Sequence, residues 1–429
     1  MSISNIKETW LFNDLKELLK SKTFRISLFI NLVYVIVSTF LTLFIFRTQN
    51  DFLVYYDAGG KFLNDINNLY TYNPELSWQF RYFPLSALFF VPFYSMGFEL
   101  GFITSQILNF CINILICVFI YKIILVIKKN NIQLDKDRVI LYISIFLISV
   151  PQFYNYILGQ INLYITLLIL ISLYIFLKKD NLIWQLIASS ILGITINLKP
   201  ITIFMIPFLI FLGYNYKRKK FYFDIKRSLL RFIGVLIPVS FNLLLFFVYP
   251  SLWEGFIETN LLGEQPVDIN HSFSITKLII NGFDFLGSAF NQLVIILIIF
   301  LIFFGIAIII YIFRRNSENS LIYGYCLGII IMLIVYFDSW DHHLLILTPI
   351  LIIIISNLDN KLNARKKYIF PSFIYFSFLS LLFLGIYYLL INIFPFNFVP
   401  TIFLIVILLG IYRHLLKNEN NIINNENTK

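Results

Sequence analysis

Charged residues are scarce in this sequence. Asp, Glu, Lys and Arg make up 13% of the 429 residues, whereas hydrophobic residues make up 59% and the mean hydropathy is +0.82. Soluble globular domains carry about 25% charged residues. The composition therefore excludes a soluble globular protein. It predicts an all-α polytopic membrane protein, because a helix satisfies its own backbone hydrogen bonds in lipid.

Cysteine and metal-binding patterns are also scarce. The three cysteines, Cys111, Cys117 and Cys326, all lie in apolar runs, which argues against a disulfide framework and a cysteine metal site. The sequence has no Gly-rich phosphate loop, no serine nucleophile elbow and no zinc-ligand spacing. Nucleotide chemistry is therefore not expected, and no cofactor is predicted, although metal dependence stays open.

The net charge of +10 is explained by membrane topology. Lys and Arg concentrate in cytoplasmic loops of membrane proteins, and the basic segments here fall on one side if the N-terminus is cytoplasmic. Only five of the 33 Lys and Arg residues then lie outside: Arg47, Lys61, Arg81, Lys199 and Lys277. This distribution favours topology and anionic lipid over nucleic acid as the reason for the basicity.

Apolar runs close to the roughly 20-residue length of a spanning helix recur along the chain. They predict about twelve spans, near residues 26–46, 101–127, 139–154, 161–177, 182–198, 201–216, 232–249, 292–313, 321–337, 344–355, 369–393 and 398–412. The run 82–98 contains Pro84, Pro92 and Gly97, and a crossing there would put the following basic loop outside. We therefore predict an interfacial or re-entrant helix for it.

This topology predicts one transmembrane domain over residues 1–416, with cytoplasmic N- and C-termini and a disordered cytoplasmic tail over 417–429. The polar stretch 1–22 is too long and too acidic for the start of a signal peptide, so the first apolar run is expected to stay as a helix. Two large outer loops are predicted, 47–100 and 250–291, and no internal repeat is found.

The first outer loop carries two candidate carboxylates. Asp51 follows the first span, where partial desolvation raises a carboxyl pKa and suits it to act as a general base, or where it is simply a solvated helix-end acid. Asp57 lies six residues on, and the pair matches no metal motif.

Two later outer positions carry candidate anion ligands. Lys199 ends a predicted span just before Pro200, where it binds a phosphate or extends to lipid headgroups. His342 and His343 lie beside Trp340, and they form either a phosphate contact or part of an interfacial aromatic belt. Adjacent helical residues point about 100° apart, so both imidazoles cannot bind one metal ion without an irregular backbone.

Five short motifs, in order along the chain, resemble those of the GT-C membrane glycosyltransferases, and within them glycosyltransferase family 87. The first-loop pattern is present as Asp51 to Tyr56, Ala58, Tyr70 and Tyr82-Phe83-Pro84-Leu85. The others are Gly159-Gln160-Ile161-Asn162, Leu192-Gly193 through Lys199-Pro200, Asn270-His271-Ser272, which also spells a glycosylation acceptor, and Ser339-Trp340-Asp341-His342-His343.

The resemblance implies a GT-C-like fold and an inverting transfer of one sugar, mannose, from a polyprenyl-phosphate donor to a lipid or glycan acceptor on the outer face of the cell membrane. By that analogy Asp51 is the general base, and the donor phosphate is bound by Lys199, His342, His343 and Arg81. Weaker substrate contacts are implied for Asp57, Tyr82, Gln160, Asn162, Asn270 and His271.

Two other functions fit a membrane protein with polar outer loops. A flippase or transporter of lipid-linked glycans also needs a polar cavity, but its ionisable groups are typically near the middle of the bilayer, whereas the candidates here lie at outer loop ends. A glycan ligase or polymerase also faces outward, and differs in moving a block of sugars.

Overall fold

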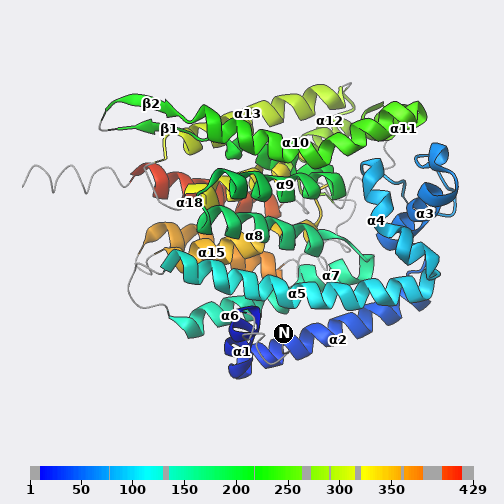
Figure 1. The fold of residues 1–429 in the computed structure, drawn as a ribbon, viewed down its shortest axis with the longest axis horizontal. Coiled ribbons are helices and arrows are strands. Elements are labelled where there is room, and N and C mark those ends of the chain that lie inside the picture. The colour runs from blue at the N-terminus through cyan, green and yellow to red at the C-terminus, as the bar shows by residue number, and fades with distance from the viewer. Residues whose placement is uncertain are drawn as a thin grey trace, which may run out of the picture.

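The computed structural model describes residues 10–76, 78–128, 135–216, 218–262, 272–288, 291–314, 320–358, 362–379 and 399–417. Helices lie side by side over most of the molecule (Figure 1). In these ranges the only sheet is a hairpin of β1 (Leu212–Asn215) and β2 (Lys220–Phe223). The prediction of an essentially all-α membrane protein is therefore confirmed.

Five stretches among the described residues are long and apolar enough to cross a membrane: α2 (Lys22–Phe44), α5 (Phe98–Lys128), α6 with α7 (Lys136–Leu158), α10 (Ile225–Val248) and α13 (Gln292–Ile312). Shorter apolar helices pack between them: α8 (Asn162–Lys178), α9 (Leu182–Leu198), α14 (Ser320–Val335), α15 (Leu344–Asn357) and α18 (Val399–Lys417). The number of spans, about twelve, remains a prediction.

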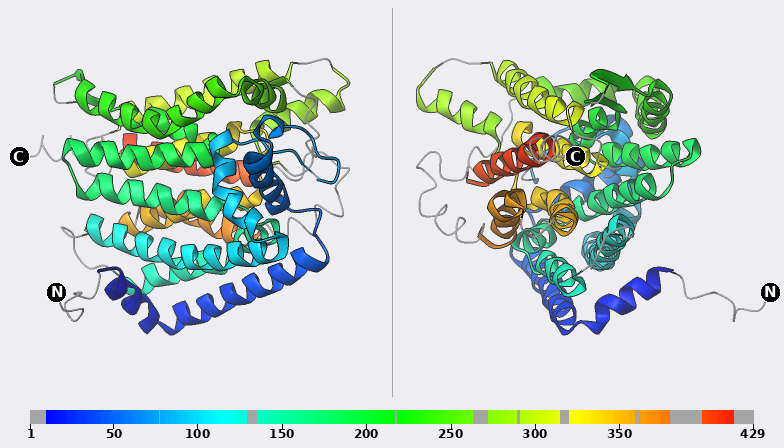
Figure 2. Two further views of the ribbon diagram at one scale, coloured as in Figure 1. Left: turned by 45° about the vertical axis from the view of Figure 1, so that its right-hand side comes forward. Right: turned by 90° about the vertical axis from the view of Figure 1, so that its left-hand side faces the viewer.

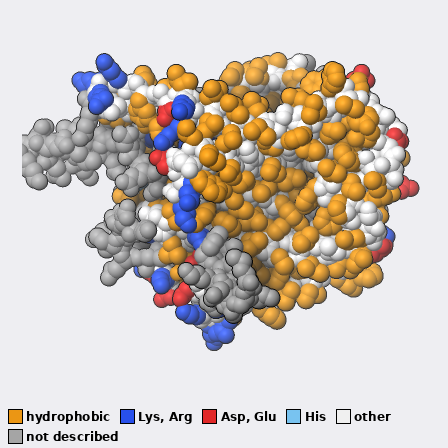
Figure 3. All heavy atoms as spheres, viewed as in Figure 1, with side chains coloured by type: hydrophobic (Ala, Val, Ile, Leu, Met, Phe, Trp, Pro, Cys, Tyr) orange, Lys and Arg blue, Asp and Glu red, His pale blue; other side chains and the backbone are white. Residues whose placement is uncertain are grey.

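The long outer helices α2, α10 and α13 differ from α14 and α15 in how far their apolar side chains are exposed. The helices α2, α10 and α13 expose large apolar side chains such as Phe40, Phe247 and Leu301, whereas nearly all of α14 and α15 is buried. Hydrophobic side chains cover the middle of the face shown in Figure 3. This surface fits contact with lipid, where exposed apolar groups carry no penalty.

The helix predicted over 139–154 is divided in the structure. It comprises α6 (Lys136–Leu147) and α7 (Val150–Leu158), with Pro151 in the first turn of α7. Side chains of α2 bind the carbonyls around this break: Asn31 donates to Leu147 at 2.8 Å and Tyr34 to Ile148 at 3.1 Å. A helix break at membrane depth is tolerated when such partners replace the lost bonds.

The segment 201–216 is not the single continuous helix that was predicted, and whether it crosses the membrane stays a prediction. Residues Pro200–Leu209 form a 3₁₀ helix, η3, and the chain then enters β1, whose Leu212 pairs with Phe223 of β2. Pro207 lacks an N–H group, and the aromatic residues that follow favour a strand. The length of the apolar run could not distinguish a continuous helix from this arrangement.

One end of the molecule is built from short helices (Figures 1 and 2). They are α3 (Asp51–Asn64), η2 (Ile66–Asn68), α4 (Pro84–Ser95), α11 (Pro250–Ile257), a π-helical turn η4 (Glu258–Leu262) and α12 (Ile275–Phe285). The 12 residues of α4 extend about 18 Å, less than the roughly 30 Å bilayer core, and α4 packs on α3. The interfacial or re-entrant position predicted for residues 82–98 stays a prediction.

The opposite end carries α1 (Trp10–Lys20) and the β1–β2 hairpin. Lys and Arg side chains gather at this end on the face shown in Figure 3. The remaining elements are η5 (Asp341–His343) before α15, and η6 (Ala364–Ile369), α16 (Phe370–Ile374) and η7 (Tyr375–Leu379) after it. Most of the predicted span 369–393 and the predicted tail fall outside the described residues.

Gly159 lies between the end of α7 and Gln160, one of the polar residues at the end of the molecule that carries α3 and α4. It ends α7 with φ of 64°, and a β-carbon added to it would lie 2.6 Å from Cβ of Phe52. An L-residue in this left-handed region costs about 1–2 kcal/mol. Gly159 therefore permits both the turn before Gln160 and the close approach of the residue that follows Asp51.

Gly159→Ala is expected to lower the midpoint of thermal unfolding in detergent, because it adds a clash with Phe52 to the backbone cost. Gly287→Ala is the matched control, since Gly287 has φ of 61° and a β-carbon added there would have nothing within 4 Å. The measurement is the difference between the two midpoints. Equal midpoints would show that the close contact with Phe52 contributes nothing to the loss of stability.

Candidate active site

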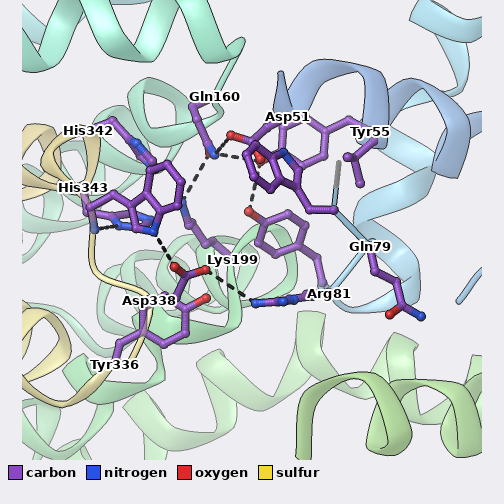
Figure 4. A pocket seen from close by; sticks show the side chains of 14 residues that line it. Asp51, Tyr55, Gln79, Arg81, Gln160, Lys199, Tyr336, Asp338, His342 and His343 are labelled. Carbon is purple, nitrogen blue, oxygen red and sulfur yellow. Dashed lines mark hydrogen bonds and ion pairs between the residues drawn. The ribbon is translucent and has the colours of Figure 1, made fainter. Parts of the chain in front are cut away.

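A cavity with an empty volume of ≈ 730 Å³, partly open to solvent, lies at the end of the molecule formed by α3 and α4. The cavity is lined by Asp51, Val54, Tyr55, Trp78, Gln79, Arg81, Tyr82, Gln160, Lys199, Tyr336, Asp338, Trp340, His342 and His343 (Figure 4). It thus joins segments that are far apart in the sequence.

The Asp51 carboxylate is held by Gln160. Asp51 begins α3 after the helix cap Asn50, where a negative charge is favoured by the helix dipole. Gln160 Nε2 donates to Asp51 Oδ2 at 2.5 Å, and Gln160 Oε1 accepts from Tyr55 OH at 3.0 Å. Since the amide oxygen is occupied by a donor, the amide nitrogen is the group that faces Asp51. Figure 4 shows both contacts.

Lys199 lies between the end of α9 and Pro200, which begins η3. Its side chain is 2% exposed, and Nζ donates to Asn162 Oδ1 at 2.8 Å and to Gln160 Oε1 at 3.4 Å. No carboxylate of the described residues forms an ion pair with it. Lys199 is therefore a buried cation coordinated by neutral amide oxygens at the wall of a cavity.

The pKa values of these two groups shift in opposite directions. Burial raises the pKa of the Asp51 carboxyl to about 6, although the hydrogen bond from Gln160 and the charge of Lys199 oppose the shift. Burial also lowers the pKa of the Lys199 ammonium far below its usual range, while the charges of Asp51 and Asp338 oppose that shift. A carboxyl with a raised pKa is suited to accept a proton near neutral pH.

Arg81 and the residues 338–343 form the other wall. Arg81 NH1 lies 3.5 Å from Asp338 Oδ2, and the indole N–H of Trp340 donates to the same carboxylate. The backbone N–H of Trp340 donates to His343 Nδ1 at 3.0 Å. In a neutral His343 the other ring nitrogen, Nε2, then carries the hydrogen and is the available donor.

The structure brings together seven of the residues singled out from the sequence. They are Asp51, Arg81, Tyr82, Gln160, Lys199, His342 and His343. Tyr82 is tied to α3 by a 3.0 Å hydrogen bond between its hydroxyl and that of Tyr55. Asn270 and His271 lie outside the described residues.

Two predicted contact residues do not line the cavity. Asp57 pairs with Lys61 at 2.9 Å, because six residues along a helix turn its side chain away from the face of Asp51 and Tyr55. Asn162 is fully buried behind Lys199, and its amide donates to Asn155 Oδ1 at 3.2 Å. The geometry favours a supporting role for Asn162.

Seven lining residues were not predicted as site residues from the sequence: Val54, Tyr55, Trp78, Gln79, Tyr336, Asp338 and Trp340. Tyr55 could have been found, because it follows Asp51 by four residues and so shares its helix face. Asp338 and Trp340 belong to the segment of the histidine pair. Nothing in the sequence singles out Trp78 or Gln79.

Within the described ranges, no group of three or more His, Cys, Asp or Glu side chains is arranged to hold a metal ion. The cationic groups of the cavity, Lys199 and Arg81, suit it to bind an anion, and Asp51 suits it to accept a proton. The arrangement can therefore support transfer of a group from an anionic carrier to a hydroxyl.

Comparison with known proteins agrees with this chemistry. No curated protein and no solved structure matches the chain. The model of the family described as glycosyltransferase family 87 matches residues 80–336, which include Arg81, Gln160 and Lys199 but not Asp51. Because this match covers more than half of the chain, the protein belongs to glycosyltransferase family 87 and is a membrane glycosyltransferase.

Proposed function

We propose that this glycosyltransferase moves a single sugar, mannose, from a polyprenyl-phosphate donor to a hydroxyl of a lipid or glycan acceptor. The observation that supports this most strongly is Lys199, a buried cation whose only hydrogen-bond partners within the described residues are two neutral amides. A buried charge is stable only when it is compensated. The phosphate of a lipid-linked sugar supplies the missing negative charge.

In the proposed reaction Asp51 takes the proton of the acceptor hydroxyl. The hydroxyl oxygen then forms a bond to the anomeric carbon of the sugar, while the bond from that carbon to the phosphate oxygen breaks. The polyprenyl phosphate leaves with the electron pair of that bond, and the configuration at the anomeric carbon is inverted. Gln160 keeps Asp51 oriented, because its amide nitrogen lies 2.5 Å from the carboxylate.

Negative charge increases on the leaving phosphate, and Lys199 with an imidazole of His342 or His343 stabilises it. A preorganised donor of this kind contributes roughly 3–4 kcal/mol to the barrier in well-studied enzymes. Arg81 adds positive charge to the same cavity, although one of its nitrogens is engaged by Asp338 at 3.5 Å. Lys199 is therefore the primary phosphate ligand in this proposal.

The active site is proposed to face the outer side of the cell membrane, with both termini in the cytoplasm. The cavity lies at the end of α3 and α4, and the basic side chains gather at the other end (Figure 3). Since Lys and Arg favour the cytoplasmic side, the cavity end is the outer one. In this proposal the donor lipid lies in the outer leaflet, with its phosphate at the level of Lys199.

Asp51→Asn is expected to reduce transfer by about 10²–10⁴-fold, the usual contribution of a general base, because an amide cannot accept the proton. The measurement is sugar transfer in vesicles supplied with polyprenyl-phosphate mannose. Glu99→Gln is the matched control, because this exposed acid at the same end of the molecule pairs with exposed Arg47. Full activity of Asp51→Asn would remove Asp51 as the base.

The pH dependence should show two limbs. Activity is expected to fall as the pH drops through about 6, because Asp51 becomes protonated, and to fall again at higher pH, because Lys199 loses its proton. Lys199→Arg should remove the alkaline limb at reduced overall activity, since a guanidinium stays charged. The measurement is kcat/KM across pH. An alkaline limb unchanged in Lys199→Arg would contradict the assignment.

A further inference from the structure

Residues 78–82, which lie just before α4 and its cap Phe83, line the cavity with four side chains: Trp78, Gln79, Arg81 and Tyr82. This segment is held firmly in place. Gln79 Nε2 donates to the Tyr70 carbonyl at 2.5 Å, and the Tyr70 hydroxyl donates to the Tyr82 carbonyl at 2.7 Å. These bonds fix the Gln79 side chain and the backbone at Tyr82 before any ligand arrives.

Two hydrogen-bond donors of this segment have no partner. The indole nitrogen of Trp78 and the Nε of Arg81 are both buried, and neither donates to an acceptor among the described residues. A buried donor without a partner destabilises the fold, and most buried polar groups in native structures are paired. By contrast, the indole nitrogen of Trp340 in the same cavity donates to Asp338.

The groups around these donors define the chemistry of a ligand. The rings of Trp78 and Trp340 meet edge to face, with centroids 6.0 Å apart and planes at 80°. The Asp338 carboxylate binds one nitrogen of Arg81 and one of Trp340, which leaves about two of its roughly four acceptor positions open. Indole surface, unpaired N–H donors and a carboxylate acceptor thus lie together.

This combination fits a sugar better than a phosphate. A sugar hydroxyl both accepts and donates hydrogen bonds, so it can pair with Trp78 or Arg81 on one side and with Asp338 on the other. The apolar C–H faces of the ring suit contact with indole. A phosphate offers acceptors only, and a carboxylate such as Asp338 repels it.

We infer that Trp78 and Arg81 form a sugar subsite, in which the indole nitrogen of Trp78 and the Nε of Arg81 donate to hydroxyl oxygens of a hexose. The inference rests on the proposed function, because it divides the same cavity into a phosphate side at Lys199 and a sugar side at Trp78. The hexose is either the transferred sugar of the donor or the sugar of the acceptor.

Trp78→Phe tests the subsite, because it keeps an aromatic ring and removes the N–H donor. Without ligand, its midpoint of thermal unfolding should equal or exceed that of the wild type, since an unsatisfied buried group has been removed. Trp253→Phe is the matched control, because Trp253 is half exposed on α11 and does not line the cavity. A large loss of stability in Trp78→Phe alone would indicate a structural role and overturn the inference.

Three probes locate the sugar: polyprenyl-phosphate mannose, polyprenyl phosphate without sugar, and methyl α-mannoside. Each should raise the unfolding midpoint of the wild type, and the sugar-bearing lipid should raise it more than the bare phosphate lipid. Loss of that excess in Trp78→Phe assigns the subsite to the donor sugar. Loss of the methyl mannoside shift alone assigns it to the acceptor sugar.

Other outcomes overturn the inference. If all three shifts in Trp78→Phe equal those of the wild type, the indole N–H binds no sugar. If the shift with bare polyprenyl phosphate falls as much as the shift with the sugar-bearing lipid, the indole N–H of Trp78 binds the phosphate and not the sugar. Failure of the proposed function is seen separately, as an equal shift of wild type and Lys199→Ala with bare polyprenyl phosphate.

Discussion

The site depends on one interaction, the burial of the Lys199 ammonium against neutral amide oxygens with no carboxylate of the described residues in contact. Its partners are Asn162 and Gln160, at 2.8 and 3.4 Å. Charge burial of this kind is costly unless an anion compensates it. The surrounding architecture holds the charge in place: α9 delivers Lys199, Pro200 turns the chain away, and Gly159 permits the tight turn before Gln160.

Gln160 links the two charges of the site. It donates to Asp51 and accepts from Tyr55 and Lys199, so it keeps the base and the cation in one network without a direct ion pair between them. A direct ion pair would lower the pKa of Asp51 and keep it ionised, and it would compensate the positive charge of Lys199. The amide bridge leaves Asp51 available to accept a proton and Lys199 available to bind an anion.

Much of this could be predicted from the sequence. The scarcity of charge predicted the helical membrane fold, and the positions of Asp51, Lys199 and the histidine pair at outer segment ends predicted their convergence. Side-chain direction could not be predicted as well, so Asp57 was expected near the site although it turns to Lys61. Apolar length alone also predicted one continuous helix where the structure has η3 and β1, because the length of a run carries no information on Pro207 or on strand pairing.

The most direct test of the account is a structure of the Asp51→Asn variant bound to polyprenyl-phosphate mannose in a lipid nanodisc. The account predicts a phosphate oxygen within hydrogen-bond distance of Lys199 Nζ and the anomeric carbon facing the side chain of residue 51. A phosphate bound away from Lys199, with the sugar outside the cavity of Asp51, Gln160 and Trp340, would contradict it.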